Sequence, residues 1–476
     1  MKVVVVGGGG AGCLASLMLA RAGHDVTLVE KDHLKAHPDI ESAAAAAFRA
    51  SAPQIVQPHI VMARCRELLA QRLPDVYAGL LSAGVVEAPL TTQMPASLAD
   101  KSSRPGDERL TQLLSRRSTI DWVLLQAAMD EQGITVRNGV KVCGLVAAPG
   151  HAGAPPVVTG IRTDHGDVRA ELVVDASGRR SALDEWLTEI TARKTSWQEA
   201  ECGLAYYSRH YGLRTGSEVP SSPLTRTVMA LDELTVGIWP GDNGTMQMGV
   251  VPLAADRRFR ALKEPAVFTS VLRLLRLYAE WLEVLDPITG VYPMGGLRNT
   301  LRRLVVDGAP VATGLLAIGD SVCTTNPTLA RGLSMAVTGA VGLVDVVEKH
   351  ADDAVAQAYA FDDLVTAHIA PFYEEQAIVD GVRLRALRHA VYGDPLQDPP
   401  PLARDRVNYW QVRAAMPFDP VAFRGFWRIM GMVSVPAEVY SDRAVVTATQ
   451  NVLAQKPVAD VIEQPSRQQL MAALSC

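Results

Sequence analysis

The sequence predicts an α/β fold that carries an inserted antiparallel β-sheet domain and ends in a helical C-terminal region. Three observations predict it. A strand, a glycine-rich loop, a helix and a second strand open the chain; short β-like runs separated by turn residues fill its middle; and a buried-strand pattern returns near residue 311. Together these features indicate a Rossmann-like nucleotide-binding domain that is interrupted by an insertion.

The first thirty residues form a complete strand–helix–strand pattern. Residues 3–6 are all valine, which is typical of a strand buried on both faces of a parallel sheet. Apolar residues then recur at helical spacing over 11–22, and Gly23 follows as a helix-ending residue. A second strand is expected over 25–29. Because the crossover joins parallel strands, it should be right-handed.

The remaining elements follow from the same periodicities. We expect helices at 59–71, 76–84, 119–131 and 333–349, strands at 134–146, 157–163, 168–174 and 311–319, and an exposed loop at 101–108. The predicted domains are a nucleotide-binding domain in two parts, 1–182 and 301–349, an inserted β-sheet domain at 183–300, and a mostly helical region at 350–476 that ends in a polar segment.

Composition excludes several classes of protein. The chain of 476 residues is 48% hydrophobic and 20% charged, which is ordinary for a globular protein. Its net charge of −5 is too small and too dispersed to favour binding to nucleic acid or to an anionic membrane. The six cysteines lie far apart without metal-ligand spacing, so neither zinc nor a disulfide framework is expected, and a reducing cytoplasm fits best. The apolar start is interpreted as a strand and helix rather than a signal peptide, and no integral membrane segment is expected.

The strongest chemical signal is the motif Gly7-x-Gly9-x-x-Gly12 between the first strand and helix. Gly7 permits the tight turn, Gly9 lets a diphosphate approach the backbone, and Gly12 lets the helix pack on the sheet. The N-terminus of the helix then offers free N–H groups to the phosphates. Glu30, at the end of the second strand, suits a ribose 2′-hydroxyl. This fingerprint by itself fits both FAD and NAD.

Two distant segments favour FAD. One is the strand ending in Asp175-Ala-Ser-Gly178-Arg, and the other is the strand ending in Gly319-Asp320. Taken in order with Asn326-Pro327 and Arg331-Gly332-Leu333, these motifs resemble the FAD-dependent monooxygenases of the aromatic-hydroxylase (para-hydroxybenzoate hydroxylase-like) superfamily. The resemblance covers about residues 1–345, so the nucleotide-binding domain is expected to bind FAD.

The resemblance implies specific cofactor contacts. The residue at the position of Asp320 holds the ribityl chain, the backbone at Gly332 and Leu333 lies beside the isoalloxazine ring, and Arg117 contacts the phosphates. The segment from Arg49 through His59 to Arg64 is similar to bacterial natural-product hydroxylases and epoxidases. The candidate cofactor-binding residues are Gly7, Gly9, Gly10, Ala11, Gly12, Glu30, Lys31, Arg49, Arg117, Val142, Asp320, Gly332 and Leu333.

The sequence also departs from the family pattern. Arg331 takes the place of a glutamine before the glycine–leucine step, where it would either add a positive charge beside the flavin or face solvent. The WxWxIP motif of flavin-dependent halogenases is missing, and Gly237-Ile-Trp239-Pro240 is the nearest string. Trp197, Tyr206, Met229, Met246, Met248 and Tyr292 would line a substrate pocket or form core, and Trp410, Phe418, Phe426 and Trp427 would cap that pocket or pack the helical tail.

If the resemblance holds, the chain is a flavoprotein monooxygenase, with a role in natural-product biosynthesis. FAD, reduced by transiently bound NADH or NADPH or supplied by a separate flavin reductase, would form a C4a-hydroperoxyflavin. That species would transfer one oxygen atom of O2 to an apolar aromatic or alkene substrate. No side chain needs to act as nucleophile, so no catalytic residue and no metal site is predicted. The alternatives are an FAD-dependent reductase or dehydrogenase, a two-component halogenase that needs halide and a lysine near its substrate, and a non-enzymatic carrier.

Overall fold

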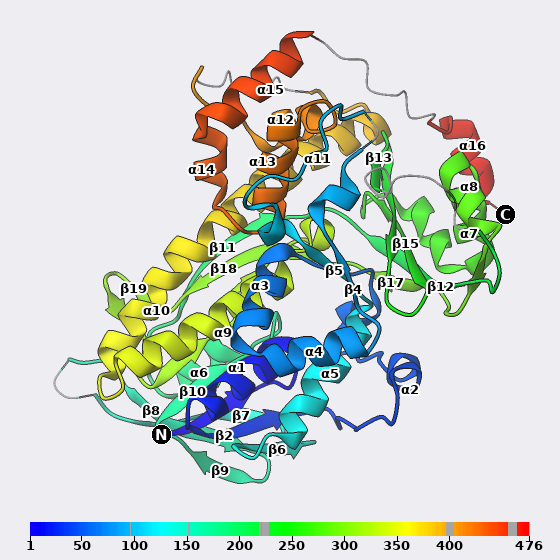
Figure 1. Cartoon of the computed structure of the whole chain (residues 1–476). Helices are drawn as coiled ribbons and strands as arrows, with labels where there is room; N and C mark the ends of the chain where they lie inside the picture. The colour runs from blue at the N-terminus through cyan, green and yellow to red at the C-terminus, as the bar shows by residue number, and fades with distance from the viewer. Residues whose placement is uncertain are drawn as a thin grey trace.

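The computed structural model describes residues 1–95, 97–150, 153–218, 220, 228–396, 404–455 and 464–475. Figure 1 shows three regions. The N-terminal elements lie at the lower left, an antiparallel sheet with its helices lies at the right, and C-terminal helices lie at the top. This arrangement confirms the predicted α/β fold with an antiparallel insertion and a helical C-terminal region.

A parallel five-stranded sheet forms the centre of the N-terminal region. Its strands are β1 (Lys2–Val6), β2 (Asp25–Glu30), β6 (Ile134–Asn138), β10 (Leu172–Asp175) and β21 (Leu315–Ala317), in the order β21-β10-β1-β2-β6. The valines of β1 are buried because both neighbours pair with this strand and helices cover the sheet. Since all five strands run the same way, their carboxyl ends meet at one edge, where ligands bind in such folds.

Three helices begin near the carboxyl edge of the parallel sheet. Helix α1 (Gly10–Arg21) follows β1, helix α5 (Arg117–Asp130) precedes β6, and helix α9 (Gly332–Lys349) follows β21. Helices α1 and α9 are buried on nearly all sides and α5 is buried along one side, and their apolar residues join the strands in one core cluster. The other elements of this region are α2 (Ile40–Ala45), η1 (Pro53–Val56), β3 (Ile60–Val61), α3 (Ala63–Arg72), α4 (Pro74–Ser82), β4 (Val86–Ala88), η2 (Leu90–Gln93), η3 (Asp107–Leu110), β5 (Gln112–Leu114), β7 (Val142–Ala148), β8 (Val157–Thr163), β9 (Gly166–Arg169) and α6 (Leu183–Glu189).

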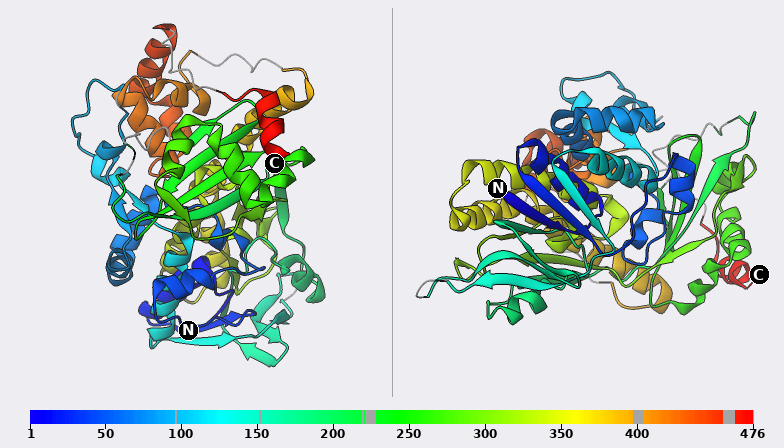
Figure 2. Two further views of the ribbon diagram at one scale, coloured as in Figure 1. Left: turned by 90° about the vertical axis from the view of Figure 1, so that its right-hand side faces the viewer. Right: turned by 90° about the horizontal axis from the view of Figure 1, so that it is seen from below.

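The inserted region contains a six-stranded antiparallel sheet. Strands β13 (Val228–Ala230), β14 (Leu234–Pro240), β15 (Thr245–Pro252), β12 (Tyr206–Leu213) and β16 (Leu285–Pro287) lie in that order, and β17 (Tyr292–Met294) also pairs with β12. One face packs on η5 (Arg257–Lys263), α7 (Pro265–Arg273) and α8 (Arg276–Leu282). Figure 2 shows these helices on the side of the sheet away from the parallel sheet. The other face is therefore turned toward the nucleotide-binding region.

A smaller antiparallel sheet joins the regions. It consists of β11 (Ser196–Glu201), β18 (Arg298–Arg303) and β22 (Cys323–Thr324), with β19 (Val305–Val306), β20 (Ala309–Pro310), η6 (Gly319–Ser321) and η7 (Pro327–Leu329) nearby in the chain.

The C-terminal helices are α10 (Ala354–His368), α11 (Ala370–Tyr392), α12 (Tyr409–Ala415), α13 (Pro420–Met430), α14 (Pro436–Ser441), α15 (Arg443–Gln455) and α16 (Arg467–Leu474).

Three local expectations need correction. The run 134–146 forms two strands, β6 and β7, because Gly139 turns the chain with a φ of 67°. The run 168–174 likewise divides into β9 and β10. The expected exposed loop at 101–108 is wrong at Asp107, which is buried and accepts two hydrogen bonds from Arg424.

The end of the chain also differs from the expected polar segment. Helix α16 buries Leu470, Ala473 and Leu474 in the core beside α7, so the tail returns to the inserted sheet. The domain boundaries at 182, 300 and 349 stay predictions. Cys476 and the proline run at 399–401 lie outside the described residues.

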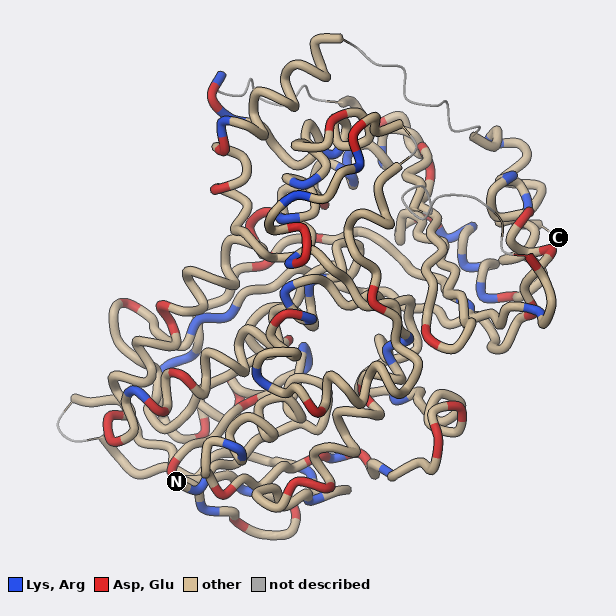
Figure 3. The backbone as a smooth tube through the Cα atoms, in the orientation of Figure 1, with Lys and Arg blue, Asp and Glu red and all other residues tan. Residues whose placement is uncertain are grey.

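Charged residues of both signs are interspersed over the chain, as Figure 3 shows. In the part of the chain that the structure describes, no helix is long and apolar enough to cross a bilayer. The same residues contain no group of three or more His, Cys, Asp or Glu side chains placed to hold a metal ion. The five described cysteines are free thiols.

Candidate flavin site

One cavity of about 410 Å³ lies at the carboxyl edge of the parallel sheet. Strands β1 and β2, the turn after β10, the start of α5 and the start of α9 all contribute residues to its wall. Every predicted cofactor residue except Gly12 lines it, namely Gly7, Gly9, Gly10, Ala11, Glu30, Lys31, Arg49, Arg117, Val142, Asp320, Gly332 and Leu333. The structure thus brings together residues separated by more than three hundred positions in the sequence.

The glycine loop shows why each glycine stands where it does. Gly7 has a φ of 108°, which an L side chain rarely adopts, and a Cβ there would lie 2.5 Å from the carbonyl oxygen of Ala176. A Cβ on Gly12 would lie 1.8 Å from the carbonyl oxygen of Gly7. Gly12 therefore allows α1 to pack closely against the loop. Because it faces the loop, it does not line the cavity. A Cβ on Gly9 would meet nothing within 4 Å, because it would point into open space.

The acidic residue at the end of β2 is anchored by backbone hydrogen bonds. Glu30 is buried, and its carboxylate accepts hydrogen bonds from the N–H of Gly8 at 2.7 Å and of Asp32 at 2.8 Å. Arg49 comes within 3.9 Å of Glu30 and 3.8 Å of Asp32, so these ion pairs lie beyond hydrogen-bond distance. Its buried Nε and Nη1 atoms have no hydrogen-bond partner among the described residues. Arg49 is therefore a cation whose donors remain available to a ligand.

Arg117 and Asp320 lie at the middle of the site. The Nε of Arg117 donates to Asp121 at 2.9 Å, and a Cβ on Gly10 would lie 2.8 Å from its Nη2. Arg117 thus lies directly against the N-terminus of α1. Burial raises the pKa of Asp320, whereas the nearby guanidinium groups of Arg117 and Arg179 lower it. No salt bridge holds the Asp320 carboxylate among the described residues, which leaves it free to accept hydrogen bonds from a ligand.

The start of α9 supplies the last predicted contacts. A Cβ on Gly332 would meet nothing within 4 Å, and the backbone N–H groups of this helix end are free of intrahelical partners. Arg331, the residue before it, is fully buried, so the solvent-facing alternative is wrong. Its guanidinium donates to the carbonyl oxygen of Phe372 at 3.0 Å and forms an ion pair with Glu375. The positive charge at this departure from the family pattern is therefore held by α11 and does not line the cavity.

The residues present fit FAD. Open space at Gly9 and Gly332 leaves room for a diphosphate and a ring beside the backbone, and Arg49 retains buried donors without partners. The cavity wall combines the cations Arg49, Arg117 and Arg179 with two helix N-termini, which suits a dianionic diphosphate. Asp320 offers a lone carboxylate acceptor for hydroxyl groups. The chemistry of the donor set thus matches a flavin dinucleotide.

Several lining residues escaped sequence reasoning. Arg179 follows the Asp175-Ala-Ser-Gly178 turn, and neither it nor Arg180 forms an ion pair within the described chain. The carboxylate of Asp175 does not face the cavity and accepts from Ser177 and Ser181, so it shapes the turn. The sequence signal that could have identified these cavity residues is the pair of arginines, Arg179 and Arg180, directly after the glycine turn. Gln57, Pro58, His59, Met294, Leu297 and Pro327 also line the cavity.

The candidate pocket residues of the inserted domain mostly form core. Met229, Met246 and Met248 pack with the helices on the far face of the six-stranded sheet. Trp197 stacks over Arg302 on the small sheet, 4.3 Å from the guanidinium carbon to the ring centroid. Tyr206 is buried and donates to Asn326, while Tyr292 stacks on Phe48. The C-terminal cluster Trp410, Phe426 and Trp427 packs the helical tail, and Phe418 packs beside it.

Comparisons with known proteins agree with this geometry. Residues 2–73 match the family model described as FAD dependent oxidoreductase. The chain is 24% identical to protein Rv3254 of Mycobacterium tuberculosis, over 70% of each chain. It is also 24% identical to the flavin-dependent halogenase armH2 of Armillaria mellea, over 71% of this chain and 63% of that protein.

Solved structures show the same fold. The flavin-dependent brominase Bmp2 superposes with a TM-score of 0.63 at 16% identity, covering 96% of this chain and all of that one (100%). A variant of 2-methyl-3-hydroxypyridine-5-carboxylic acid oxygenase superposes with a TM-score of 0.54 at 17% identity, covering 82% of this chain and 95% of that one. On the matched N-terminal motif, the shared fold and the cavity that collects its residues, the chain is an FAD-dependent oxidoreductase with the fold of flavin monooxygenases and halogenases.

Proposed function

We propose that this chain is a monooxygenase that inserts one oxygen atom of O2 into an apolar aromatic or alkene small molecule, as in natural-product biosynthesis. The overall balance consumes one substrate, one O2, one NAD(P)H and one proton, and it yields the oxygenated product, one water and NAD(P)⁺. Bound FAD would supply the two-electron redox chemistry and the activation of oxygen. Electrons would come from NADH or NADPH that binds transiently, or from a separate flavin reductase.

The observation that carries this proposal is the change from charged to apolar lining residues along this cavity. Cations and helix N-termini line the part around the glycine loop, whereas Pro58, Met294, Leu297 and Pro327 line another part of the wall. The chain's own residues would hold the diphosphate with Arg49 and Arg117, accept ribityl hydroxyl groups at Asp320 and exclude water from the apolar wall. Because no nucleophile is required, orientation of the substrate is the main remaining task.

A halogenase is the second candidate, because armH2 and Bmp2 are named as such. Two features favour oxygenation instead. The lysines among the described lining residues are Lys31 and Lys141, which lie near Glu30, since the N–H of Val140 donates to its carbonyl oxygen. The ring of Trp239 lies across Gly237 and Gly249, where it covers the sheet. Both lysines therefore lie next to the Glu30 end of β2, and the nearest string to WxWxIP covers backbone.

The visible absorption spectrum of the purified protein tests the proposal. We expect a bound flavin band that bleaches when NADH or NADPH is added without oxygen and recovers in air, with substrate-dependent incorporation of ¹⁸O from ¹⁸O2. Reduction only in the presence of a reductase would assign the electrons to a partner. Incorporation of bromide or chloride in place of ¹⁸O would support the halogenase. Reduction of the substrate by reduced flavin, or oxidation of the substrate by oxidised flavin, without consumption of oxygen would support a reductase or a dehydrogenase respectively.

A further inference from the structure

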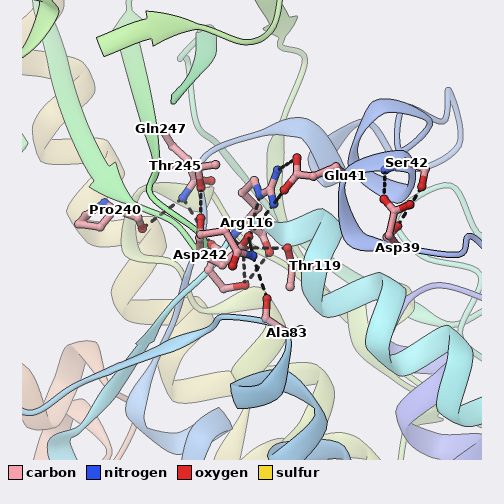
Figure 4. Close-up of polar contacts among 12 residues, drawn as sticks. Asp39, Glu41, Ser42, Ala83, Arg116, Thr119, Pro240, Asp242, Thr245 and Gln247 are labelled. Carbon is pink, nitrogen blue, oxygen red and sulfur yellow. Dashed lines mark hydrogen bonds and ion pairs between the residues drawn. The ribbon is translucent and has the colours of Figure 1, made fainter. Parts of the chain in front are cut away.

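The turn between β14 and β15 contacts the nucleotide-binding region. Asn243 and Gly244 adopt left-handed φ values of 51° and 69°, which is typical of a tight hairpin. Asp242, just before them, is fully buried. Its carboxylate accepts the backbone N–H of Arg116 at 2.7 Å and the hydroxyl of Thr119 at 2.7 Å (Figure 4). The hairpin therefore holds the N-terminus of α5.

Arg116 completes this contact with its side chain. Its Nε and Nη2 donate to Asp242 at 3.0 and 2.7 Å, and its Nη1 and Nη2 donate to Glu41 of α2 at 3.0 and 2.7 Å (Figure 4). Burial would raise the pKa of Asp242, but the bonds from Arg116 outweigh it, so the pKa lies below its usual value. A buried ion pair thus fixes the residue directly before Arg117, which lines the cavity.

The next strand of the hairpin fixes a second lining residue. Gln247 on β15 is fully buried, and its Oε1 accepts the backbone N–H of His59 at 3.0 Å. Its Nε2 donates to the carbonyl oxygen of His59 at 3.1 Å. One side-chain amide therefore holds both backbone polar groups of His59. His59 lines the cavity, and its buried Nε2 has no hydrogen-bond partner in the part of the chain that the structure describes.

We propose that the β14–β15 hairpin positions Arg117 and His59 for the bound flavin dinucleotide, through Asp242 and Gln247. Both contacts come from one short segment of the inserted sheet. Asp242 holds Arg116, which directly precedes the lining residue Arg117, and Gln247 holds the lining residue His59. A shift of the hairpin would therefore move a cation and an imidazole together. The inserted sheet, which on this view sets the geometry of the cofactor site, contributes no described lining residue from β14 or β15 itself.

The affinity of the apoprotein for FAD tests the role of Asp242. In Asp242→Asn we expect the Kd for FAD, measured by quenching of flavin fluorescence, to rise at least tenfold. The matched control is Asp107→Asn, because Asp107 is also buried and accepts from Arg424 at 2.7 Å through two nitrogens, yet it does not line the cavity. The control should lower the apoprotein Tm comparably and leave the Kd within twofold. Equal changes of Kd in both variants would overturn the proposal.

A double-mutant cycle tests whether Asp242 acts through Arg117. The Kd of the double variant Asp242→Asn/Arg117→Gln should lie within about twofold of that of Arg117→Gln alone, because the positioned group is already gone. Multiplicative effects would show that Asp242 does not act through Arg117. If Asp242→Asn does not fold, Thr119→Val removes one donor from the same carboxylate, and a roughly threefold rise in Kd that vanishes in the Arg117→Gln background is expected.

Gln247 is tested with the flavin spectrum as a second readout. Gln247→Leu should shift the visible absorption maximum of bound FAD and raise its Kd, since the ring of His59 is no longer held. The same substitution in a His59→Ala background should change neither quantity further. A shift of equal size in both backgrounds would contradict positioning of His59 and leave Gln247 a structural residue only.

Discussion

The glycine loop after β1 and the β14–β15 hairpin both act on the same cavity, but they are built in opposite ways. Around the loop, the space beside Gly9 is open, and two donor atoms of Arg49 have no partner among the described residues, so both features can accommodate a ligand. In the hairpin, Asp242 and Gln247 are fully buried and their bonds are made within the protein. On the proposed function, the comparison teaches that groups left without partners would bind the cofactor, whereas saturated groups next to them would hold the binding groups in place.

The largest expected effect comes from the loop itself. Gly12→Val should lower the free energy of unfolding by about 4 kcal/mol or more, because even a Cβ would lie 1.8 Å from the carbonyl oxygen of Gly7. Gly9→Ala should change stability by less than about 0.5 kcal/mol, since its Cβ would meet nothing within 4 Å and its φ of −82° suits alanine. Urea denaturation of the two apoproteins measures the difference.

Affinity for FAD sharpens the same contrast. Although Gly9→Ala should fold normally, its methyl group would occupy the space that a diphosphate needs, so the Kd for FAD should rise more than tenfold. A normal Kd in Gly9→Ala would show that the cofactor does not approach the loop. Normal stability of Gly12→Val would break the distinction between a packing glycine and a binding glycine.

A second large effect is expected where the chain departs from its family pattern. Glu375→Gln should cost about 3 kcal/mol of stability, because it leaves the buried guanidinium of Arg331 without its countercharge. Chemical denaturation of the apoprotein measures this. Glu199→Gln is the control, since Glu199 pairs with Arg298 at the surface and should contribute less than about 1 kcal/mol. Similar losses in both variants would contradict a buried, charged pair.

Sequence reasoning found the parts of the site that neighbouring residues encode. The loop after β1 and Glu30 fall within thirty residues, so spacing alone predicted the strand–helix–strand unit and its acid. Gln247 and His59, by contrast, are 188 positions apart, and only the folded sheet shows that they pair. The Asp-Asn-Gly string is typical of a turn, and nothing in it indicates that the carboxylate of Asp242 accepts hydrogen bonds from the start of α5. The environment of Arg331 could not be predicted for the same reason, because its partner, Glu375, lies in a helix 44 residues away.

Asp320 tests the ligand side of the comparison. Asp320→Asn should raise the Kd for FAD about 10- to 100-fold, since an acceptor for hydroxyl groups becomes neutral; hydrogen bonds to charged groups are worth about 1.5–3 kcal/mol. Among the described residues its carboxylate has no ion pair to lose, and burial raises its pKa, so the apoprotein should become slightly more stable. Fluorescence titration and denaturation check the two parts. A large loss of stability with unchanged affinity would show that Asp320 stabilises the fold and does not bind the cofactor.

The smallest effect concerns the pH dependence of the inserted sheet. Burial, aided by Arg116 and opposed by Asp242, lowers the pKa of His210 to about 4, against about 6.5 in the unfolded chain. Below pH 6.5 the unfolded chain takes up a proton that the folded protein does not, so stability is lost as the pH falls from about 6.5 to about 4. His210→Asn should reduce that slope by about 1 kcal/mol per pH unit, whereas His165→Asn at the surface should not. Urea denaturation at several pH values measures the slopes. An unchanged slope in His210→Asn would mean that burial beside the Arg116–Asp242 pair does not keep the imidazole of His210 uncharged. The polar groups around the hairpin would then be less completely shielded from water than their contacts imply.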